Sequence, residues 1–437
     1  MKMKNTTAAV NVLAGRGRLA GMIAAALICG TCCGAEPTLH WTGAVSTLWD
    51  FATQNWADSS DVPCVYRDGE SVLVDTSKFT GNLYNMTATS TFNPSEIEFH
   101  VEKNKTITHT TASGAAVLFG ASVTKVRKTG EGTYFFDNWS NMRNFAGFKG
   151  ASTVEVENGV MRMTGPNTVY TMGPDNGAPT QWNVWDGATL QMSSRNMSGN
   201  PGLGSSVKLF VKKGGTLKFG PDPQNASYQC GGLFNEVKFE GGSHIVWGDA
   251  YDRNGGQLCV WKRLSVSGDE AVTIGTAGDA DHTVFLGRGG SGRLPAPQVC
   301  AREDGGYCVI DVDDVVEGVD LDIAARICRQ SGCETNMVGF VKTGPGTLRF
   351  SATGDAEQFG INGDIDIREG EVQFAARHSF THAYTNTVCV SSGAILRCAA
   401  DDCALEYRLP GGHSRTKILI DGGSYVFDDS CGGGGGR

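Results

Sequence analysis

The chain alternates apolar and polar residues in short runs, and these runs are joined in pairs across a glycine or an aspartate. Alternation with a period of two places every second side chain on one face of a β-strand. Five such pairs follow one another along the middle of the chain: VEVENGVMRM (154–163), NVWDGATLQM (183–192), LFVKKGGTLKF (209–219), VKFEGGSHIVW (237–247) and LSVSGDEAVTI (264–274). The pattern therefore predicts repeated units of strand, turn and strand.

The turns of these units recur at a nearly constant interval. Their central residues are spaced 28, 27, 28 and 27 apart: Gly159, Gly187, Gly214, Gly242 and Asp269. Three later units repeat the pattern, with turns at Gly370, Gly393 and Gly423. One such unit cannot bury its apolar face alone, whereas stacked coils bury it continuously. An all-β parallel β-helix is the predicted fold, and an antiparallel β-sandwich, which also has short strands, is the alternative.

Residues 275–338 interrupt this rhythm. GRGGSGRLPAPQ (287–298) has the composition of a loop, and DLDIAARICRQSG (320–332) spaces Ile323 and Ile327 as a helix would. Asp320 or Asp322 could cap such a helix, and Gly332 could end it. The segment is therefore expected to be an irregular excursion from the coils that contains a short helix.

Composition agrees with a turn-dense β-protein that has a core. The chain has 437 residues, of which 60 are glycine, 40% are hydrophobic and 19% are charged. That apolar content is enough for a continuous core and argues against disorder.

The first residues are typical of an export signal. Four cations precede or flank a short apolar run that ends in small residues, and the preferred cleavage point follows Ala35. A lipid anchor on Cys29 or Cys32 is the alternative. The expected organisation is a signal peptide at 1–35, a cap segment at 36–80, the β-helix at 81–430 and a glycine-rich tail at 431–437, with no transmembrane segment in the mature chain. Secretion or display on the outer cell surface follows.

Cleavage would change both charge and cysteine content. It removes four cations and no anions, which takes the net charge from −9 to −13 and disfavours nucleic acid as a partner. Eleven of the fourteen cysteines remain. Cys328/Cys333 and Cys398/Cys403 share a spacing that some zinc ligands use, but no histidine pair completes a site, so local disulfides or buried thiols are the favoured interpretation. No cofactor is expected.

One triplet suggests catalysis. Serine β-lactamases use Lys-Thr-Gly beside a Ser-x-x-Lys and a Ser-x-Asn, and this chain has Lys342-Thr343-Gly344, Ser122 with Lys125, and Ser194 with Asn196. The nucleophilic serine of those enzymes opens a helix. Ser122 instead lies in a β-branched, alternating stretch, so the strand interpretation is favoured over the catalytic one.

Two other groups of residues could carry chemistry. VIDVDDVVEGVDLD (309–322) is acidic, and Asp311 and Asp313, on one strand face, are candidate metal ligands or acid–base groups; a solvated turn surface is the competing interpretation. His282 near Arg288 could serve a lyase but equally fits a polar loop. Trp41, Trp49 and Trp56 could stack on a sugar or could cap the end of a solenoid, and capping is favoured.

Two stretches resemble each other and a known family. KTGEGTYFF (128–136) matches KTGPGTLRF (342–350), and each is followed by a strand pair turned by glycine. This pattern resembles the autotransporter-associated β-strand repeat of exported bacterial surface proteins, also called the passenger-associated transport repeat. The resemblance implies coils of a right-handed parallel β-helix, with structural roles for Lys128, Gly130, Gly132, Lys342, Gly344 and Gly346.

The segment after the signal resembles the one that often precedes such repeats. It matches at these positions: Trp41, Gly43, Trp49, Asn55, Trp56, Asp68 and Val72. The last ten residues, DDSCGGGGGR, carry no amphipathic strands of a membrane barrel, so export through a barrel of its own is not expected.

These observations favour one function and leave two alternatives. A non-catalytic, adhesin-like scaffold at the cell surface is expected first, with surface glycans or other surface proteins as partners. A polysaccharide lyase or glycosidase built on the β-helix is the alternative, and a carbohydrate-binding surface module is another. Gly344 and Gly346 are expected to form a tight corner, with Leu348 and Phe350 facing the core and Lys342 and Arg349 facing solvent.

Overall fold

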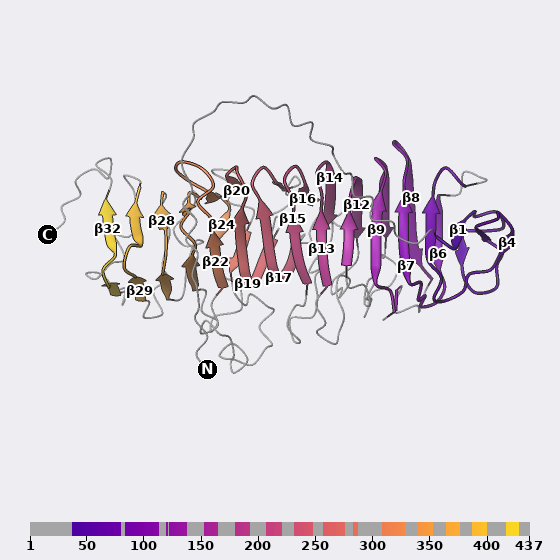
Figure 1. Cartoon of the computed structure of the whole chain (residues 1–437), viewed down its shortest axis with the longest axis horizontal. Helices are drawn as coiled ribbons and strands as arrows, with labels where there is room; N and C mark the ends of the chain where they lie inside the picture. The colour runs from indigo at the N-terminus through magenta and orange to yellow at the C-terminus, as the bar shows by residue number, and fades with distance from the viewer. Residues whose placement is uncertain are drawn as a thin grey trace, which may run out of the picture. The chain divides into compact units, whose positions relative to one another are not determined.

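Strands and tight turns make up every described part of the chain. The computed structural model describes residues 37–79, 84–112, 119–120, 122–137, 153–164, 180–192, 207–220, 231–247, 257–275, 283–286, 308–327, 339–352, 364–375, 387–399 and 417–427. No helix occurs within these ranges, and so none there is long and apolar enough to span a membrane. The strands stack side by side in chain order (Figure 1).

The first sheet contains one strand from nearly every coil. Its members pair in parallel, apart from the antiparallel pairs β1–β3 and β3–β4 at the N-terminal end. They are β1 (Leu39–Trp41), β3 (Trp56–Asp58), β4 (Pro63–Cys64), β5 (Val72–Asp75), β7 (Glu96–His100), β9 (Lys125–Thr129), β11 (Thr153–Val156), β13 (Thr180–Val184), β15 (Val207–Val211), β17 (Gly231–Glu240), β19 (Gln257–Ser267), β21 (Thr283–Leu286), β22 (Cys308–Val312), β24 (Arg326–Ile327), β25 (Phe340–Thr343), β27 (Ile365–Ile367), β29 (Thr387–Val390) and β31 (Lys417–Ile420).

Two further sheets take the strands that follow the turns. The second sheet contains β2 (Leu48–Trp49), β6 (Asn85–Ala88), β8 (Thr106–Thr111), β10 (Thr133–Asp137), β12 (Gly159–Thr164), β14 (Ala188–Met192), β16 (Thr216–Phe219) and β18 (His244–Trp247). The third contains β20 (Val272–Ile274), β23 (Leu321–Ile323), β26 (Thr347–Phe350), β28 (Glu371–Phe374), β30 (Ile395–Cys398) and β32 (Ser424–Phe427). All pairings in these two sheets are parallel.

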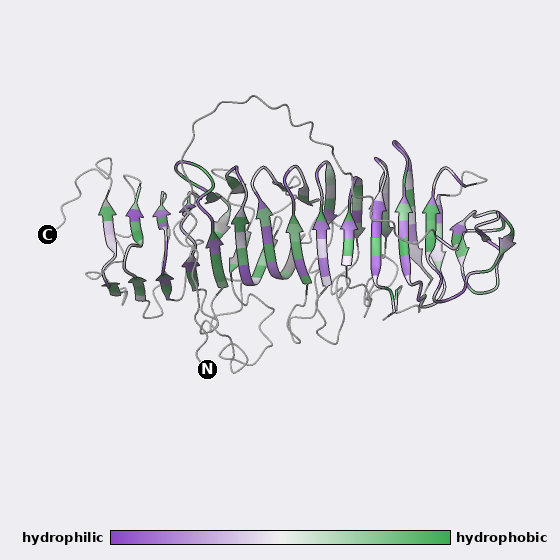
Figure 2. Ribbon diagram, in the orientation of Figure 1, coloured by the Kyte–Doolittle hydropathy of each residue, from purple (hydrophilic) through white to green (hydrophobic). Residues whose placement is uncertain are grey.

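The core is built from columns of inward-facing side chains. One column runs through successive register partners in the first sheet, all of them buried: Val126, Val154, Trp182, Leu209 and Val237. Hydrophobic and hydrophilic positions alternate along many of the strands (Figure 2). Because each coil covers the apolar face of its neighbour, burial is continuous through the stack. The predicted all-β parallel β-helix is confirmed, and the antiparallel sandwich is not observed.

The expected short helix at 320–332 is wrong for the residues described. Leu321–Ile323 is strand β23, which pairs with β20 and β26, and Arg326–Ile327 is strand β24. Leu321 and Ile323 are both buried, as alternate residues of a strand are. The spacing of two between them therefore described this segment better than the helical spacing of Ile323 and Ile327. Strands β21 to β24 belong to the stack, and the described parts of 275–338 are therefore not an excursion.

Two turn residues were assigned one position too late. Gly159, Gly187, Gly214, Gly242, Gly370 and Gly393 all have positive φ, as the repeat predicts. In the two other units the positive φ belongs to Gly268 rather than Asp269, and to Gly422 rather than Gly423. Each of these turns offers a glycine beside the predicted residue, and glycine takes that conformation without steric cost.

The N-terminal end of the stack is filled by aromatic rings. Trp41, Trp49 and Trp56 are fully buried. The ring centroid of Trp56 lies 5.2 Å from that of Trp41 and 5.0 Å from that of Trp49, in edge-to-face arrangements. These rings cover the first coil, whose apolar side chains would otherwise meet water.

A buried asparagine shapes the loop that holds these rings. Asn55 Oδ1 accepts hydrogen bonds from the backbone N–H groups of Val45, at 3.0 Å, and Ser46, at 2.9 Å. Its Nδ2 donates to Leu48 O at 2.7 Å. The amide thus satisfies backbone groups that the loop cannot pair with itself, which explains a polar side chain inside an aromatic cluster.

His109 lies in the same cluster as a neutral side chain. It is fully buried, stacks on Trp49 with centroids 5.6 Å apart, and its Nδ1 is 3.0 Å from the Tyr134 hydroxyl oxygen. Burial lowers the pKa of His109 to about 3. Among the described residues, Nε2 has no hydrogen-bond partner, so a second proton on the ring would be buried without an acceptor.

Replacing His109 is expected to flatten the acid side of the stability profile. Between pH 6.5, the ordinary pKa of histidine, and about 3, the unfolded chain binds a proton that the folded chain does not. The free energy of unfolding therefore falls as the pH falls, by about 2 kcal/mol from this group at about pH 5. Urea unfolding at several pH values should show that loss in the wild type and not in His109→Phe.

The control for this measurement is His244→Gln. His244 is exposed at the start of β18 and outside the aromatic cluster, so its replacement should leave the slope of the wild type unchanged. Equal slopes for the wild type and His109→Phe would contradict the prediction.

Candidate functional site

The Lys-Thr-Gly stretches form two corners that have the same internal contacts. We call Lys128 to Gly132 and Lys342 to Gly346 the lysine corners. Lys342 follows the buried Phe340 at a spacing of two, and its register partners are Ile310 and Ile367. The lysine therefore occupies an inward position in an apolar column.

The expectation that Lys342 faces solvent is wrong. Its side chain is fully buried, and Nζ donates to the backbone oxygens of Thr343, Gly344 and Glu369, at 2.9, 2.7 and 3.2 Å. The first two acceptors belong to its own corner and the third to the turn of the next coil. Burial is possible because the methylene groups of Lys342 line the core while its ammonium group reaches the turn. Arg349 is partly exposed as expected, and its guanidinium contacts Asp322 at 2.6 Å.

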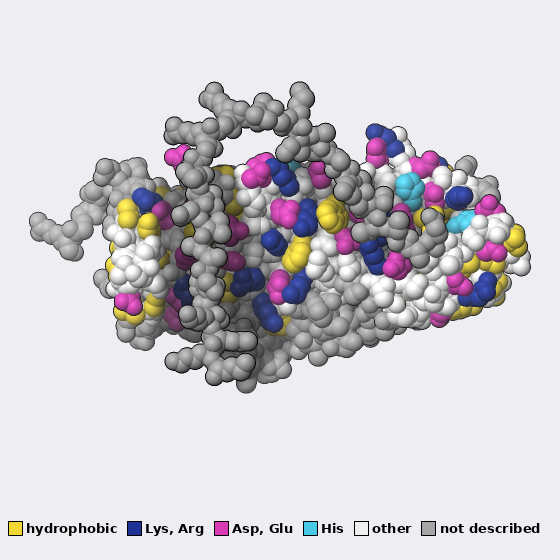
Figure 3. Space-filling view, in the orientation of Figure 1, with side chains coloured by type: hydrophobic (Ala, Val, Ile, Leu, Met, Phe, Trp, Pro, Cys, Tyr) yellow, Lys and Arg dark blue, Asp and Glu magenta, His cyan; other side chains and the backbone are white. Residues whose placement is uncertain are grey.

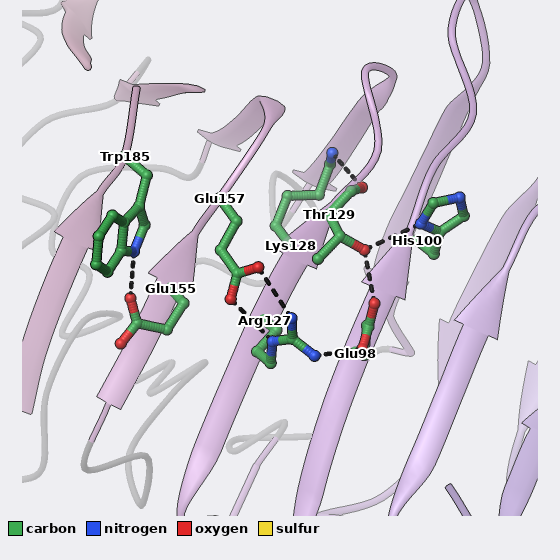
Figure 4. Close-up of polar contacts among 8 residues, drawn as sticks. All are labelled: Glu98, His100, Arg127, Lys128, Thr129, Glu155, Glu157 and Trp185. Atoms are coloured by element: carbon green, nitrogen blue, oxygen red, sulfur yellow. Dashed lines mark hydrogen bonds and ion pairs between the residues drawn. The ribbon is translucent and has the colours of Figure 1, made fainter. Parts of the chain in front are cut away.

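Lys128 repeats this arrangement. It is fully buried, and Nζ donates to the backbone oxygens of Thr129, Gly130 and Asn158, at 2.8, 2.7 and 3.0 Å. Figure 4 shows its ammonium group turned toward Thr129. Each lysine thus joins its own corner to the turn of the following coil.

Three acceptors match the three N–H groups of an ammonium ion, whereas a neutral amine has only two. Burial lowers the pKa of Lys128 and of Lys342 to about 8, and nearby Asp311 acts on Lys342 in the opposite direction. At neutral pH both corners therefore hold the charged form, in which every N–H group has an acceptor.

The glycines of the corners lie against the backbone of the preceding coil. An added Cβ on Gly344 would lie 2.4 Å from Val312 O, and one on Gly346 would lie 2.2 Å from Asp313 O. Gly344 also has a φ of 79°. Gly130, with a φ of 73°, and Gly132 meet the same obstruction, from Val101 and Glu102. These positions exclude any side chain because consecutive coils touch there.

The threonine of each corner binds an acidic residue on the preceding coil. Thr129 Oγ1 donates to Glu98 Oε1 at 2.7 Å, and Thr343 Oγ1 donates to Asp311 Oδ1 at 2.9 Å. Arg127 then bridges Glu98 and Glu157, at 2.8 and 2.9 Å (Figure 4). Every polar residue of the Lys-Thr-Gly motif is thus used in joining coils.

The β-lactamase arrangement is not formed by the described residues. Lys125 begins strand β9 and Ser122 lies in the turn before it, so no helix places that serine and lysine together. The ammonium group of Lys342 is enclosed by backbone oxygens. Ser194 and Asn196 lie outside the described residues.

The acidic candidates Asp311 and Asp313 have different surroundings in the structure. Asp311 accepts from Thr343 and forms an ion pair of 2.8 Å with Arg263, while Asp313 is exposed just after β22. Asp320 is buried and its carboxylate accepts three backbone N–H groups, those of Val315, Val316 and Thr347, at 2.8, 2.9 and 2.6 Å. Within the described ranges, no three His, Cys, Asp or Glu residues are grouped as a metal site.

Other candidates are only partly described. His282, Arg288, Cys328, Cys333 and Cys403 lie outside the described residues. Cys64 and Cys389 are free thiols, and Cys398 is buried in β30. The three N-terminal tryptophans have no exposed ring face, so none is available there to stack on a sugar.

Sequence reasoning missed the exposed Trp185. It follows β13 with 43% of its surface exposed, and its indole Nε1 donates to Glu155 Oε2 at 2.6 Å (Figure 4). The alternation in NVWDG already places Val184 inward and Trp185 outward, and that was the available signal.

Comparison of the chain with protein-family models, with curated proteins and with solved structures finds no match. The contacts within the chain are therefore the basis for assigning its function.

Removing the ammonium group of a lysine corner is expected to destabilise the fold. Lys342→Met keeps an unbranched four-atom stem in the core but leaves three backbone oxygens without their donor, at a cost of about 2 kcal/mol. Chemical denaturation should show this loss. Lys213→Met is the matched control, because Lys213 is half exposed and pairs with Asp269 and Glu270 at the surface, so its loss should change little. Equal stabilities of the two variants would contradict the assigned role of Lys342.

Adding a methyl group at a lysine corner should cost more than adding one at an open turn. Gly344 and Gly393 have similar φ values, 79° and 82°, but only Gly344 has backbone atoms in the way. Gly393→Ala should cost about 1 kcal/mol from its backbone conformation, and Gly344→Ala at least about 2 kcal/mol more because the coils must separate. Thermal unfolding of the two variants compares them directly, and equal melting temperatures would refute the close packing of coils at this corner.

Proposed function

We propose that this chain is a non-catalytic, exported or cell-surface scaffold, adhesin-like in its architecture. The main support for the proposal is the burial of Lys342, whose ammonium group donates to three backbone oxygens. The triplet that most resembles catalytic chemistry is engaged entirely in holding coils together, and the same contacts recur at Lys128. A catalytic triplet is needed once, whereas a structural corner is useful in several coils.

The acidic residues of the described coils support the same proposal. Asp311 is engaged by Arg263 and Thr343, and Asp322 by Arg349 and Ser351. A general acid or base must reach a substrate proton directly. Carboxylates whose oxygens already accept bonds from charged or hydroxyl donors are better suited to joining strands.

Membership of the autotransporter-associated repeat group is part of this proposal, as is export by residues 1–35. Two observations support the membership: both KTGxG stretches take the same corner, and residues that carried the N-terminal resemblance make fixed contacts with one another or with the next coil. Gly43 packs on Trp41 and has a φ of 58°, and Asp68 Oδ1 accepts from Asn93 N at 2.8 Å. Such fixed contacts explain why these residue types would recur in a cap.

Recovery of the full chain from a bacterial host tests the proposal. The chain is expressed with residues 1–35 intact, collected outside the cytoplasm, and incubated with polygalacturonate, alginate, hyaluronan and a soluble β-glucan. No new reducing ends and no unsaturated sugars are expected, because the lysine corner and its acidic neighbours are occupied by structural contacts.

A pectate lyase and an endoglucanase serve as positive controls for product detection. Product formed by this chain from any of the four polysaccharides would overturn the non-catalytic proposal in favour of a polysaccharide-acting β-helix. Retention in the cytoplasm with residues 1–35 uncleaved would overturn export.

A further inference from the structure

Among the described tryptophans, Trp185 is the one that is exposed. Trp182, three residues earlier, is fully buried, whereas 43% of Trp185 is exposed. It lies on the outer side of the first sheet, immediately after β13, between the coils of β11 and β15. Tryptophan is enriched at recognition surfaces because its ring is apolar while its N–H group is polar.

A chain of polar side chains fixes the ring of Trp185 in place. Its Nε1 donates to Glu155 Oε2 at 2.6 Å, and the other oxygen of Glu155 accepts from Asn183 Nδ2 at 2.9 Å. Asn183 Oδ1 in turn accepts from Gln181 Nε2 at 3.0 Å. Because each link lies on an ordered strand, the ring is held in one orientation before any ligand arrives.

Lys212 positions the ring from the next coil. Its Nζ lies 5.7 Å from the ring centroid of Trp185 and forms an ion pair of 2.8 Å with Glu240. A cation at this distance interacts with the negative face of the indole. Rigid aromatic rings give up little conformational entropy on binding, which favours affinity.

The chemistry around the ring fits a sugar. A pyranose presents one face of C–H groups, which pack on an aromatic ring, and an edge of hydroxyl groups that require hydrogen-bond partners. At the rim of Trp185, each oxygen of Glu155 keeps a second lone pair beside its bond to Trp185 or Asn183, and Lys212 keeps N–H groups beside the one that binds Glu240, so both can also bind sugar hydroxyl groups. We propose that Trp185, Glu155, Asn183 and Lys212 form a binding platform for a pyranose unit of a neutral glycan.

The charge pattern argues for a neutral rather than an acidic glycan. Lys and Arg side chains lie among Asp and Glu side chains on the face seen in Figure 3. Arg127 and Lys212, two cations of these coils, are already paired with Glu157 and Glu240. An anionic polymer would meet paired cations and additional carboxylates, whereas hydroxyl groups can bind to either partner. The platform adds a recognition site to the proposed scaffold and does not depend on that scaffold lacking catalysis.

Affinity gel electrophoresis and calorimetry of the full chain test the platform. The probes are cellohexaose, mannohexaose and a galactan oligosaccharide, with their soluble parent polysaccharides in the gel and polygalacturonate as the acidic comparison. The wild type is expected to bind at least one neutral probe. Trp185→Ala should weaken that binding at least about tenfold, and Trp185→Phe, which keeps a ring but loses the indole N–H, should lie between the two.

Val246→Ala is the matched control, because Val246 is similarly exposed at 41% and lies on β18 of the second sheet. It should bind as the wild type does, and all three variants should melt at the wild-type temperature. The platform is refuted if the wild type binds no neutral probe, if it binds only polygalacturonate, or if Trp185→Ala binds undiminished. Sugar release would contradict the non-catalytic proposal alone, so the two ideas fail separately.

Discussion

Each coil of this protein must turn a corner without leaving buried backbone oxygens unpaired. The N–H and C=O groups of each strand pair with those of the next coil in a ladder of backbone hydrogen bonds. This ladder is interrupted at a turn, where the chain changes direction. At two corners a lysine ammonium group fills this need by donating to three carbonyl oxygens, two in its own turn and one in the next. Other elements of the stack depend on this, because register across consecutive coils is fixed where the corners meet.

Glycine and lysine act together at these corners. Gly344 and Gly346 bring the backbone within contact distance of Val312 and Asp313 in the preceding coil. Gly370 brings the following coil against the backbone oxygens of Gly344 and Gly346, and this closeness allows one ammonium group to reach two coils. A side chain at Gly370 would force these two coils apart and lengthen the bond from Lys342 to Glu369. The motif is therefore a single mechanical unit, in which the small residues set the distance and the cation satisfies the acceptors that this distance buries.

The alternating pattern and the glycine period were sufficient to predict the parallel β-helix, because inward burial and tight turns depend on local residue types. The burial of Lys342 was not predicted, since a cation at an inward position is interpretable only when its acceptors, among them Glu369 of the next coil, are known. The prediction of a helix at 320–332 failed for a related reason. Ile323 has an apolar partner two residues away, Leu321, as in a strand, and another four residues away, Ile327, as in a helix. Pairing of Leu321 and Ile323 with β20 and β26 decided in favour of the strand. Trp185 could be placed outward from sequence, but its contact with Glu155 crosses coils.

Rigidity at the corners has a consequence for the surface. Glu155, Trp185 and Lys212 come from three consecutive coils, and their relative positions are only as fixed as the spacing of those coils. In a flexible loop, the indole would lose entropy on binding, and part of the contact energy with a ligand would be offset. On stacked strands that loss has already occurred during folding. A scaffold whose interior is devoted to holding coils in register is thus well suited to presenting a small, preorganised recognition site on its outer sheet.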